Sequence, residues 1–319
     1  MSHHYPLPSG TYVFERGWLS SNNVLMVGSD CTALVDSGYS LHASQTLALV
    51  QSQLANRGLD LLINTHLHSD HCGGNALLQA TYDGLTTLIP SGNANAVAAW
   101  DQDTLTYKAT GQHCDRFGFT GTLAVGASLL LGAHEWQVHA APGHDPDSVV
   151  LFEPVTRTLI SADALWENGF GVVFPELEGL AAFDAVAASI DLCERLKPNI
   201  VIPGHGPVFT DVAAAIRRAR SRLDYLRTGD PPINHSLYAA KVLLKFFLLE
   251  HQRVTPAEAT NWLTNMPYFQ LLQPTLAQHL AAKGVALEHS PATAVSQWLL
   301  AALCKSGAAK VDGDHIVNV

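Results

Sequence analysis

The stretch THLHSDHCGGN, residues 65–75, places three histidines and an aspartate within six positions: His66, His68, Asp70 and His71. Side chains two positions apart on an extended chain point to the same side, so His66 and His68 are expected to bind one metal ion together. The two glycines that follow favour a turn, which would direct Asp70 and His71 toward a second ion. Imidazole and carboxylate ligands suit zinc first, with iron or manganese as alternatives. The stretch therefore predicts parts of two metal sites.

Three single residues further along the chain have the same chemistry. They are His144 in APGHDPDS, Asp163 in LISADAL and His205 in VIPGHGPV, and each follows a predicted strand. Strand ends beside Gly and Pro turns are where a rigid scaffold presents functional groups. Each residue alone would pass as a structural or surface residue. Together, and in this order after the histidine motif, they indicate that the two metal sites are completed from distant parts of the chain.

The order of predicted elements indicates the fold. Short apolar runs predict strands at 11–14, 23–28 and 32–38, and a helix is predicted at 41–57. The run LDLLINT, residues 59–65, predicts a strand buried on both faces that leads into the histidine motif. Further short strands are predicted over 122–162, then a helix at 180–196 and the strand NIVIP. Two similar halves, each with strands followed by a helix, predict an α/β four-layer αββα sandwich.

Beyond residue 230 the pattern becomes helical. The segment GDPPINHS predicts a boundary between a catalytic domain, 1–229, and a second domain, 230–319. Thr255-Pro256-Ala257-Glu258 has the pattern of a capping box, and Ser290-Pro291 predicts the start of another helix. Asp312-Gly313 predicts a terminal hairpin. Several helices and a hairpin predict a small, mainly helical, winged-helix-like C-terminal domain.

The bulk composition limits the function classes. The formal net charge is −10, so a basic nucleic-acid footprint over the whole protein is absent. The five cysteines show no CxxC spacing, which favours a reducing compartment. The first residues lack a signal-peptide pattern, and no apolar run is long enough for a membrane span. We therefore expect a cytoplasmic protein with no membrane partner.

The residues quoted above, spread over roughly residues 10–210, resemble the metallo-β-lactamase superfamily, whose fold is the αββα sandwich. The resemblance implies a first metal held by His66, His68 and His144, and a second held by Asp70, His71 and His205. It implies that Asp163 bridges both ions. It also implies that Asp36, in LVDSG, lies behind the ligands and fixes the orientation of the histidines.

The presence of Asp163 distinguishes branches of this superfamily. True β-lactamases lack this bridging aspartate, so the resemblance is to glyoxalase II, the lactonases and the lactamase-β-like-2 branch. We expect a dinuclear hydrolase in which a hydroxide shared by the two ions attacks a small ester, thioester or lactone. Asp70 and Asp163 are the expected catalytic carboxylates, with Asp70 relaying a proton.

Substrate contacts are expected from Trp166, Phe170 and Arg222. The two aromatic residues follow Asp163 and are expected at the mouth of the cleft. Arg222 is one of four arginines in RRARSR, residues 217–222, which cannot all share one helix face. One or two of them could contact an anionic group of the substrate.

Three other functions stay open. A phosphodiesterase or endoribonuclease is suggested by the branch resemblance and by the arginines, although residues 230–319 carry equal numbers of acidic and basic residues. An iron-dependent oxidoreductase would use one metal, whereas the full ligand set indicates two. A winged-helix DNA-binding regulator is disfavoured by the intact ligand set and by the charge-neutral tail. The expected partners are a small-molecule substrate and, as a homodimer, a second copy of the chain, with nucleic acid not favoured.

Overall fold

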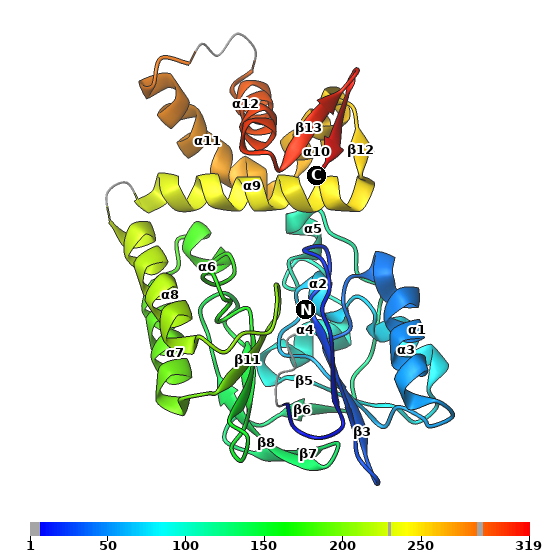
Figure 1. Cartoon of the computed structure of the whole chain (residues 1–319). Coiled ribbons are helices and arrows are strands. Elements are labelled where there is room, and N and C mark those ends of the chain that lie inside the picture. The colour runs from blue at the N-terminus through cyan, green and yellow to red at the C-terminus, as the bar shows by residue number, and fades with distance from the viewer. Residues whose placement is uncertain (1–6, 229–230, 286–289) are drawn as a thin grey trace. The chain divides into compact units, whose positions relative to one another are not determined.

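The computed structural model describes residues 7–228, 231–285 and 290–319 (Figure 1). The chain divides into two compact units. The first comprises Met1–Tyr107, His113–Pro175 and Ala181–Leu223, and the second comprises Lys108–Gln112, Glu176–Leu180 and Asp224–Val319. The predicted domain boundary between residues 229 and 230 falls outside the described residues.

The first unit contains a six-stranded sheet in the order β1-β2-β3-β4-β5-β6. Its strands are β1 (Thr11–Phe14), β2 (Asn23–Val27), β3 (Thr32–Val35), β4 (Leu61–Ile63), β5 (Thr86–Pro90) and β6 (Gly121–Leu123). The first three strands are antiparallel, as the predicted hairpins require, and β3 to β6 run parallel. Strand β4 is therefore central and buried, which agrees with its continuous apolar run.

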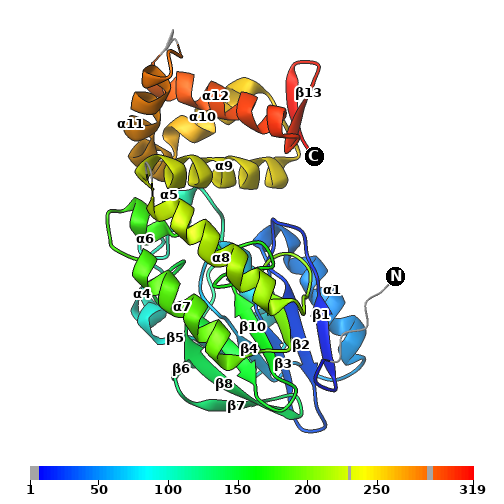
Figure 2. The same ribbon diagram turned by 60° about the vertical axis from the view of Figure 1, so that its left-hand side comes forward.

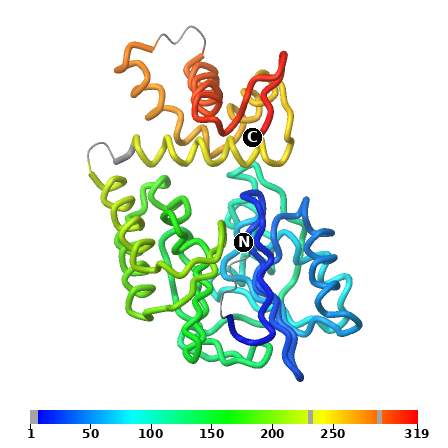
Figure 3. Tube along the Cα trace, viewed as in Figure 1, coloured from blue at the N-terminus to red at the C-terminus, as the bar shows by residue number. Residues whose placement is uncertain are grey.

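A second sheet of five strands has the order β11-β10-β9-β8-β7. Its strands are β7 (Ser128–Leu131), β8 (His134–Ala140), β9 (Val149–Glu153), β10 (Thr158–Ala162) and β11 (Ile200–Pro203). Only the β10–β11 pair is parallel, and the helix α7 (Phe183–Leu196) connects these two strands. In Figure 3 the trace is blue to cyan over the segments of the first sheet and mainly green over those of the second, so residues 11–123 build one sheet and residues 128–203 the other.

The two sheets pack face to face, and strand alternation decides which side chains meet. Val24 and Met26 of β2 belong to the core cluster that includes Trp136 of the second sheet. Leu25, between them in sequence, instead packs with Leu54 of α1 (Ala43–Leu54). Period-two alternation in β2 thus sends neighbouring residues to opposite faces of the sheet.

Helices cover the outer faces of both sheets. Helix α1 and the short helix α3 (Asn75–Thr81) lie on the first sheet. Helices α7 and α8 (Val212–Arg227) lie over the outer side of the second sheet (Figure 2). The predicted αββα sandwich is therefore confirmed.

Residues 91–119 form a compact, partly helical segment with η2 (Ser91–Asn93), α4 (Ala94–Ala99) and α5 (Tyr107–Thr110). Two further short helices elsewhere in the chain are η1 (Ser40–His42) and α6 (Phe174–Leu177). Tyr107 is only 1% exposed and donates a hydrogen bond to Leu67 O. It belongs to a small apolar core with Leu67, Cys72 and Phe117.

The second unit is mainly helical, as predicted. It contains α9 (Pro231–His251), β12 (Arg253–Val254), α10 (Pro256–Asn265), α11 (Pro267–Ala282), α12 (Pro291–Ser306), β13 (Ala309–Asp312) and β14 (His315–Asn318). The capping box at Thr255 and the helix start at Ser290 are both present. The terminal hairpin turns at Gly313, and the sheet order is β12-β14-β13. The winged-helix assignment itself stays a prediction.

Among the described residues, no helix combines the length and the apolar character that crossing a bilayer requires.

Candidate metal centre

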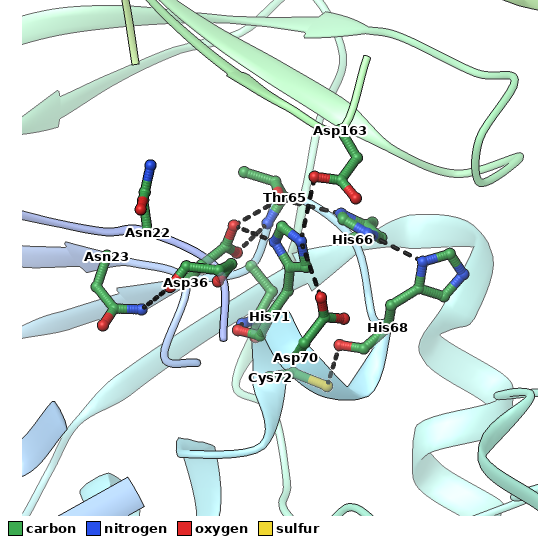
Figure 4. A network of polar contacts seen from close by, with 12 residues as sticks. Asn22, Asn23, Asp36, Thr65, His66, His68, Asp70, His71, Cys72 and Asp163 are labelled. Atoms are coloured by element: carbon green, nitrogen blue, oxygen red, sulfur yellow. Dashed lines mark hydrogen bonds and ion pairs between the residues drawn. The ribbon is translucent and has the colours of Figure 1, made fainter. Parts of the chain in front are cut away.

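Ligand-type side chains gather where the strands of the first unit end (Figure 4). Strand β4 ends at Ile63, and the next residues form a loop that holds His66 and His68 before the single-turn helix α2 (Ser69–Cys72). The expected extended strand at these two histidines is therefore wrong, although they do face the same centre. Asp70 and His71 lie on α2 itself, where the turn changes their direction.

Three imidazoles form the first ligand cluster, which we call the imidazole cluster: His66, His68 and His144. His66 Nε2 lies 3.1 Å from His68 Nδ1, and His68 Nδ1 lies 2.7 Å from His144 Nε2. Burial, followed by the neighbouring imidazoles, lowers the pKa of His68 to about 3 and that of His66 well below its usual range. The rings are therefore neutral, which is the form that binds metal.

The hydrogen bonds of these rings leave their inward nitrogens available. His144 Nδ1 donates to Val172 O, and His66 Nδ1 lies 3.2 Å from the Thr65 hydroxyl oxygen. With those nitrogens protonated, the Nε2 atoms of both rings carry lone pairs, which converge with His68 Nδ1. A single proton cannot satisfy three converging nitrogens, whereas one cation can. The imidazole cluster therefore fits a divalent metal ion.

Asp70, His71 and His205 form a second group, which we call the mixed cluster. Asp70 Oδ2 lies 3.0 Å from His205 Nε2 and 4.0 Å from His71 Nε2. His71 is fully buried, and its Nε2 makes no hydrogen bond of good geometry in the described part of the chain, although carboxylate oxygens of Asp163 and Asp70 lie 3.4 Å and 4.0 Å away. Despite burial, Asp36, Asp163 and Asp70 hold the pKa of His71 well above its usual range. A buried nitrogen that faces two carboxylates without a well-formed hydrogen bond fits a metal ligand.

Asp163 lies between the two clusters, directly after β10. Its Oδ2 is 3.3 Å from His144 Nε2, and its Oδ1 is 3.4 Å from His71 Nε2 and 3.8 Å from His205 Nε2. Burial raises the pKa of Asp163, but His205 and His71 outweigh it and hold that pKa well below its usual range. The carboxylate is thus ionised, with one oxygen toward each cluster.

Asp36 supports the ligands from behind (Figure 4). His71 Nδ1 donates to Asp36 Oδ2 at 2.7 Å, so Nδ1 carries the proton and Nε2 faces the mixed cluster. Thr65 donates to Asp36 twice, from its backbone N–H at 2.8 Å and from its hydroxyl at 2.7 Å. The Thr65 hydroxyl can in turn accept from His66 Nδ1. One carboxylate therefore orients a histidine of each cluster.

Sequence reasoning missed Thr65 and two glycines. A Cβ on Gly171 would lie 2.3 Å from His144 Nδ1, and a Cβ on Gly204 would lie 2.2 Å from Asp163 Oδ1. Both positions therefore require glycine for the ligands to keep their places. The PGHG turn indicates the importance of Gly204 in the sequence, but no local pattern marks Thr65 or Gly171.

The three expected substrate contacts have different surroundings. Trp166 is half-buried and donates its indole N–H to Asp163 Oδ1 at 3.1 Å, so it contacts the site directly. Phe170 is 1% exposed and does not line the cleft mouth, which corrects our expectation. Arg222 holds its guanidinium 5.2 Å from the Phe170 ring centre, so both residues pack beside the turn that follows Asp163.

The other arginines of α8 also make contacts within the protein. Arg218 Nε donates to Glu167 O at 2.6 Å, and Arg220 pairs with both Asp191 and Glu194 of α7. Arg217 is exposed. The arginine-rich pattern is thus explained largely by packing of α8 onto its neighbours.

Cys72 follows the ligand residues in sequence but points away from them. Its thiol lies 3.2 Å from the Tyr107 hydroxyl and 3.8 Å from the Cys114 sulfur, in the small apolar core. Burial is the main reason that its pKa is well above the usual range. The histidine and aspartate groups form the candidate centre without it.

Comparison with known proteins matches residues 16–205 to a family model described as "Metallo-beta-lactamase superfamily". The chain is 26% identical over 230 residues to "Probable metallo-hydrolase YqjP" of Bacillus subtilis, covering 61% of this chain and 70% of that protein. It is 24% identical to a hydroxyacylglutathione hydrolase of Brucella anthropi, over 51% of each protein. It is also 24% identical to an acyl-coenzyme A thioesterase of Bos taurus, over 65% of this chain and 81% of that one.

Solved structures share the fold. A metallo-beta-lactamase family protein of Thermus thermophilus matches 98% of this chain and 99% of its own, with a TM-score of 0.55 and 18% identity. A protein named TTHA1623, solved in a di-iron-bound form, matches 65% of this chain and 98% of its own, with a TM-score of 0.50 and 26% identity. The first match shows that the order of a sandwich followed by a helical region is shared by a solved protein.

Proposed function

The chain belongs to the metallo-β-lactamase superfamily, and on that premise we propose that it is a dinuclear metal-dependent hydrolase of small thioesters, esters or lactones. The observation that carries the proposal is the placement of Asp163, whose two carboxylate oxygens face two adjoining clusters of ligand atoms. A site for one ion would not need a carboxylate with an oxygen toward each cluster.

The donor chemistry supports the metal assignment. His66, His68 and His144 would hold one ion, Asp70, His71 and His205 the other, and Asp163 would contact both. Nitrogen and carboxylate donors suit zinc first, with iron or manganese as alternatives. Divalent ions at such a site supply Lewis acidity and make a water nucleophilic near neutral pH.

The side chains around the ligands have separate tasks. Asp70 is the most exposed carboxylate of the group, with 15% of its side chain accessible, so it can reach a substrate atom. Asp70 is therefore the carboxylate that we expect to accept a proton and to pass it to the leaving group. Asp36, Thr65 and the Val172 carbonyl fix the ring orientations and hold the protons on the outward nitrogens. The site is therefore organised before substrate arrives.

Thioesters are the substrate class we favour. A hydroxyacylglutathione hydrolase and an acyl-coenzyme A thioesterase are among the relatives, and both names denote acyl groups carried on a thiol. The alternative of a phosphodiesterase or endoribonuclease was suggested by the branch resemblance and by the arginines of α8. Arg218 and Arg220 are engaged within the protein, so this structural support for phosphate binding is weak.

The test is a hydrolysis panel with metal-loaded protein. Thioester, ester, lactone, phosphodiester and labelled RNA substrates are compared for the wild type, His66→Ala and Asp163→Ala, with bound metal measured by elemental analysis. His113→Ala is the matched control, because this exposed histidine pairs only with Asp115 among ionic partners in the described part of the chain. We expect two equivalents of metal and thioester hydrolysis in the wild type and control. Equal hydrolysis by all four proteins, or one metal per chain in the wild type, would contradict the proposal.

A further inference from the structure

Trp18 is an exposed indole beside the metal centre. Its side chain is 54% exposed, although a tryptophan ring contributes one of the largest apolar surfaces of any residue. The ring stacks on His205, with ring centroids 5.5 Å apart and planes 8° from parallel. Trp166 meets both rings edge-on, at 5.3 Å from Trp18 and 5.4 Å from His205. We call these two indoles the aromatic corner.

The loop that carries Trp18 is fixed to the ligand-bearing turns. Ser21 N–H donates to Asp70 O at 2.9 Å, and Asn22 N–H donates to Gly204 O at 2.7 Å. The Asn22 side-chain amide donates to two further carbonyls of the same turn, and its carbonyl oxygen accepts from Arg16 N–H at 2.8 Å. Trp18 is therefore presented in a fixed position beside the centre, at little further cost in conformational entropy on binding.

The turn that carries Trp166 is fixed from its other side. Trp166 N–H donates to Gly169 O at 2.7 Å, which closes a tight turn after Asp163. Arg218 donates to the carbonyl of Glu167 in this turn. A Cβ on Gly169 would lie 2.7 Å from Arg222 Nη1, so the Arg222 side chain packs directly against the turn. The two arginines of α8 thus position Trp166.

We propose that the aromatic corner binds the apolar acyl group of the substrate and makes the enzyme selective for aromatic or extended acyl groups over acetyl. This inference rests on the proposed function. The Trp166 indole N–H contacts Asp163, so the corner begins at an atom of the reacting site. The acyl group is bonded directly to the carbonyl carbon, whereas the leaving thiol lies across the bond that breaks. The half-exposed face of Trp18 gives a flat acyl group a surface on which to stack.

The kinetic test compares acyl groups on one thiol. Acetyl, hexanoyl and phenylacetyl thioesters of N-acetylcysteamine are assayed with the wild type, Trp18→Ala, Trp18→Phe and, as a matched control, Leu130→Ala. Leu130 is also more than half exposed, but lies on β7. We expect kcat/KM for phenylacetyl relative to acetyl to fall about tenfold in Trp18→Ala, mainly through KM, and to be largely kept in Trp18→Phe and Leu130→Ala. Unchanged selectivity in Trp18→Ala would overturn the proposal. It would also be overturned if Trp18→Ala changed the selectivity among several thiols that carry one acyl group, but not the selectivity among acyl groups.

A binding measurement separates this inference from the proposed function. Calorimetric titration of zinc-loaded protein with acetate and phenylacetate measures binding at the aromatic corner without turnover. We expect phenylacetate to bind about tenfold more tightly than acetate in the wild type, and the preference to disappear in Trp18→Ala. If the wild type cleaves no thioester but shows this Trp18-dependent preference, the proposed function fails and the corner stands. If it cleaves thioesters and the two carboxylates bind equally, the corner fails and the function stands.

Discussion

The imidazole cluster and the mixed cluster lie side by side but are built differently. Three neutral rings form the first, and two of them, His66 and His68, come from one loop. Nδ1 of His68 lies 3.1 Å from His66 Nε2 and 2.7 Å from His144 Nε2. The second combines a carboxylate with two histidines, and one of these depends on Asp36 for its orientation. Residues 66–71 therefore supply two of the three ligands of each cluster, whereas the third ligand and the groups that orient the rings come from distant parts of the chain.

Replacing Asp163, which faces both clusters, should have the largest effect. Asp163→Ala removes the only described carboxylate with an oxygen toward each cluster, so both metal positions weaken. We expect kcat/KM to fall by about 10³-fold, equivalent to about 4 kcal/mol of transition-state stabilisation. Elemental analysis should show less than two equivalents of metal. A variant that keeps two metals would show that Asp163 does not connect the clusters.

Removing Asp36 should weaken metal binding at the mixed cluster more than at the imidazole cluster. Asp36→Ala leaves His71 Nδ1 without its acceptor, while His68 and His144 keep their own contacts. We expect metal affinity and activity to fall by about 10- to 100-fold, the usual effect of losing a residue that orients a ligand. Stepwise titration with zinc should show that one of the two binding steps is weakened more than the other. Equal weakening of both steps would show that Thr65 transmits the loss to His66 as well.

Acid should destabilise the metal-free protein through the imidazole cluster. Burial lowers the pKa of His68 to about 3, whereas the unfolded chain has the usual histidine pKa near 6.5. Between these values the unfolded state binds more protons, so stability falls as pH decreases from about 6.5 toward 3. Thermal unfolding of chelator-treated protein should show this slope, and His68→Gln should reduce it. A slope that is identical in His68→Gln would contradict the contribution of His68.

The smallest predicted effect is that of the Trp166 hydrogen bond. Trp166→Phe keeps a ring beside His205 but removes the N–H that donates to Asp163 Oδ1, the oxygen facing the mixed cluster. One hydrogen bond to a charged group contributes about 1.5 kcal/mol, so metal affinity at that cluster should fall about tenfold. Competition with a zinc chelator measures it. An unchanged affinity would assign Trp166 to substrate contact alone.

Several features were readable from the sequence because they depend on local patterns. Alternating apolar runs predicted the strands, Thr255-Pro256 predicted a helix start, and Asp312-Gly313 predicted a hairpin turn, all of which are present. The expectation that a strand extends through His66 and His68 failed, because β4 ends at Ile63 and both histidines lie in the loop before α2. The two rings still converge, since the chain bends between the strand and α2 and directs both toward His144.

Other features could not be read in this way because their meaning depends on contacts far apart in the chain. Phe170 resembles a cleft residue by its position after Asp163, but Arg222 and the turn bury it. The arginines of α8 resemble an anion site, yet Arg218 and Arg220 bind groups of neighbouring elements. Trp18 carries no sequence signal, because only the bonds from its loop to Asp70 and Gly204 place it beside His205.

The sequence by itself determined which chemical groups are present, their order along the chain and the alternation that builds two sheets. Side-chain type and short-range periodicity are properties of neighbouring residues, so they survive without knowledge of the fold. Only the tertiary structure decided that Asp163 has one oxygen toward each cluster, that Asp36 orients a histidine of each cluster, and that Trp18 lies open beside His205. These are distances between atoms brought together by strand pairing and sheet packing, and no local pattern encodes them.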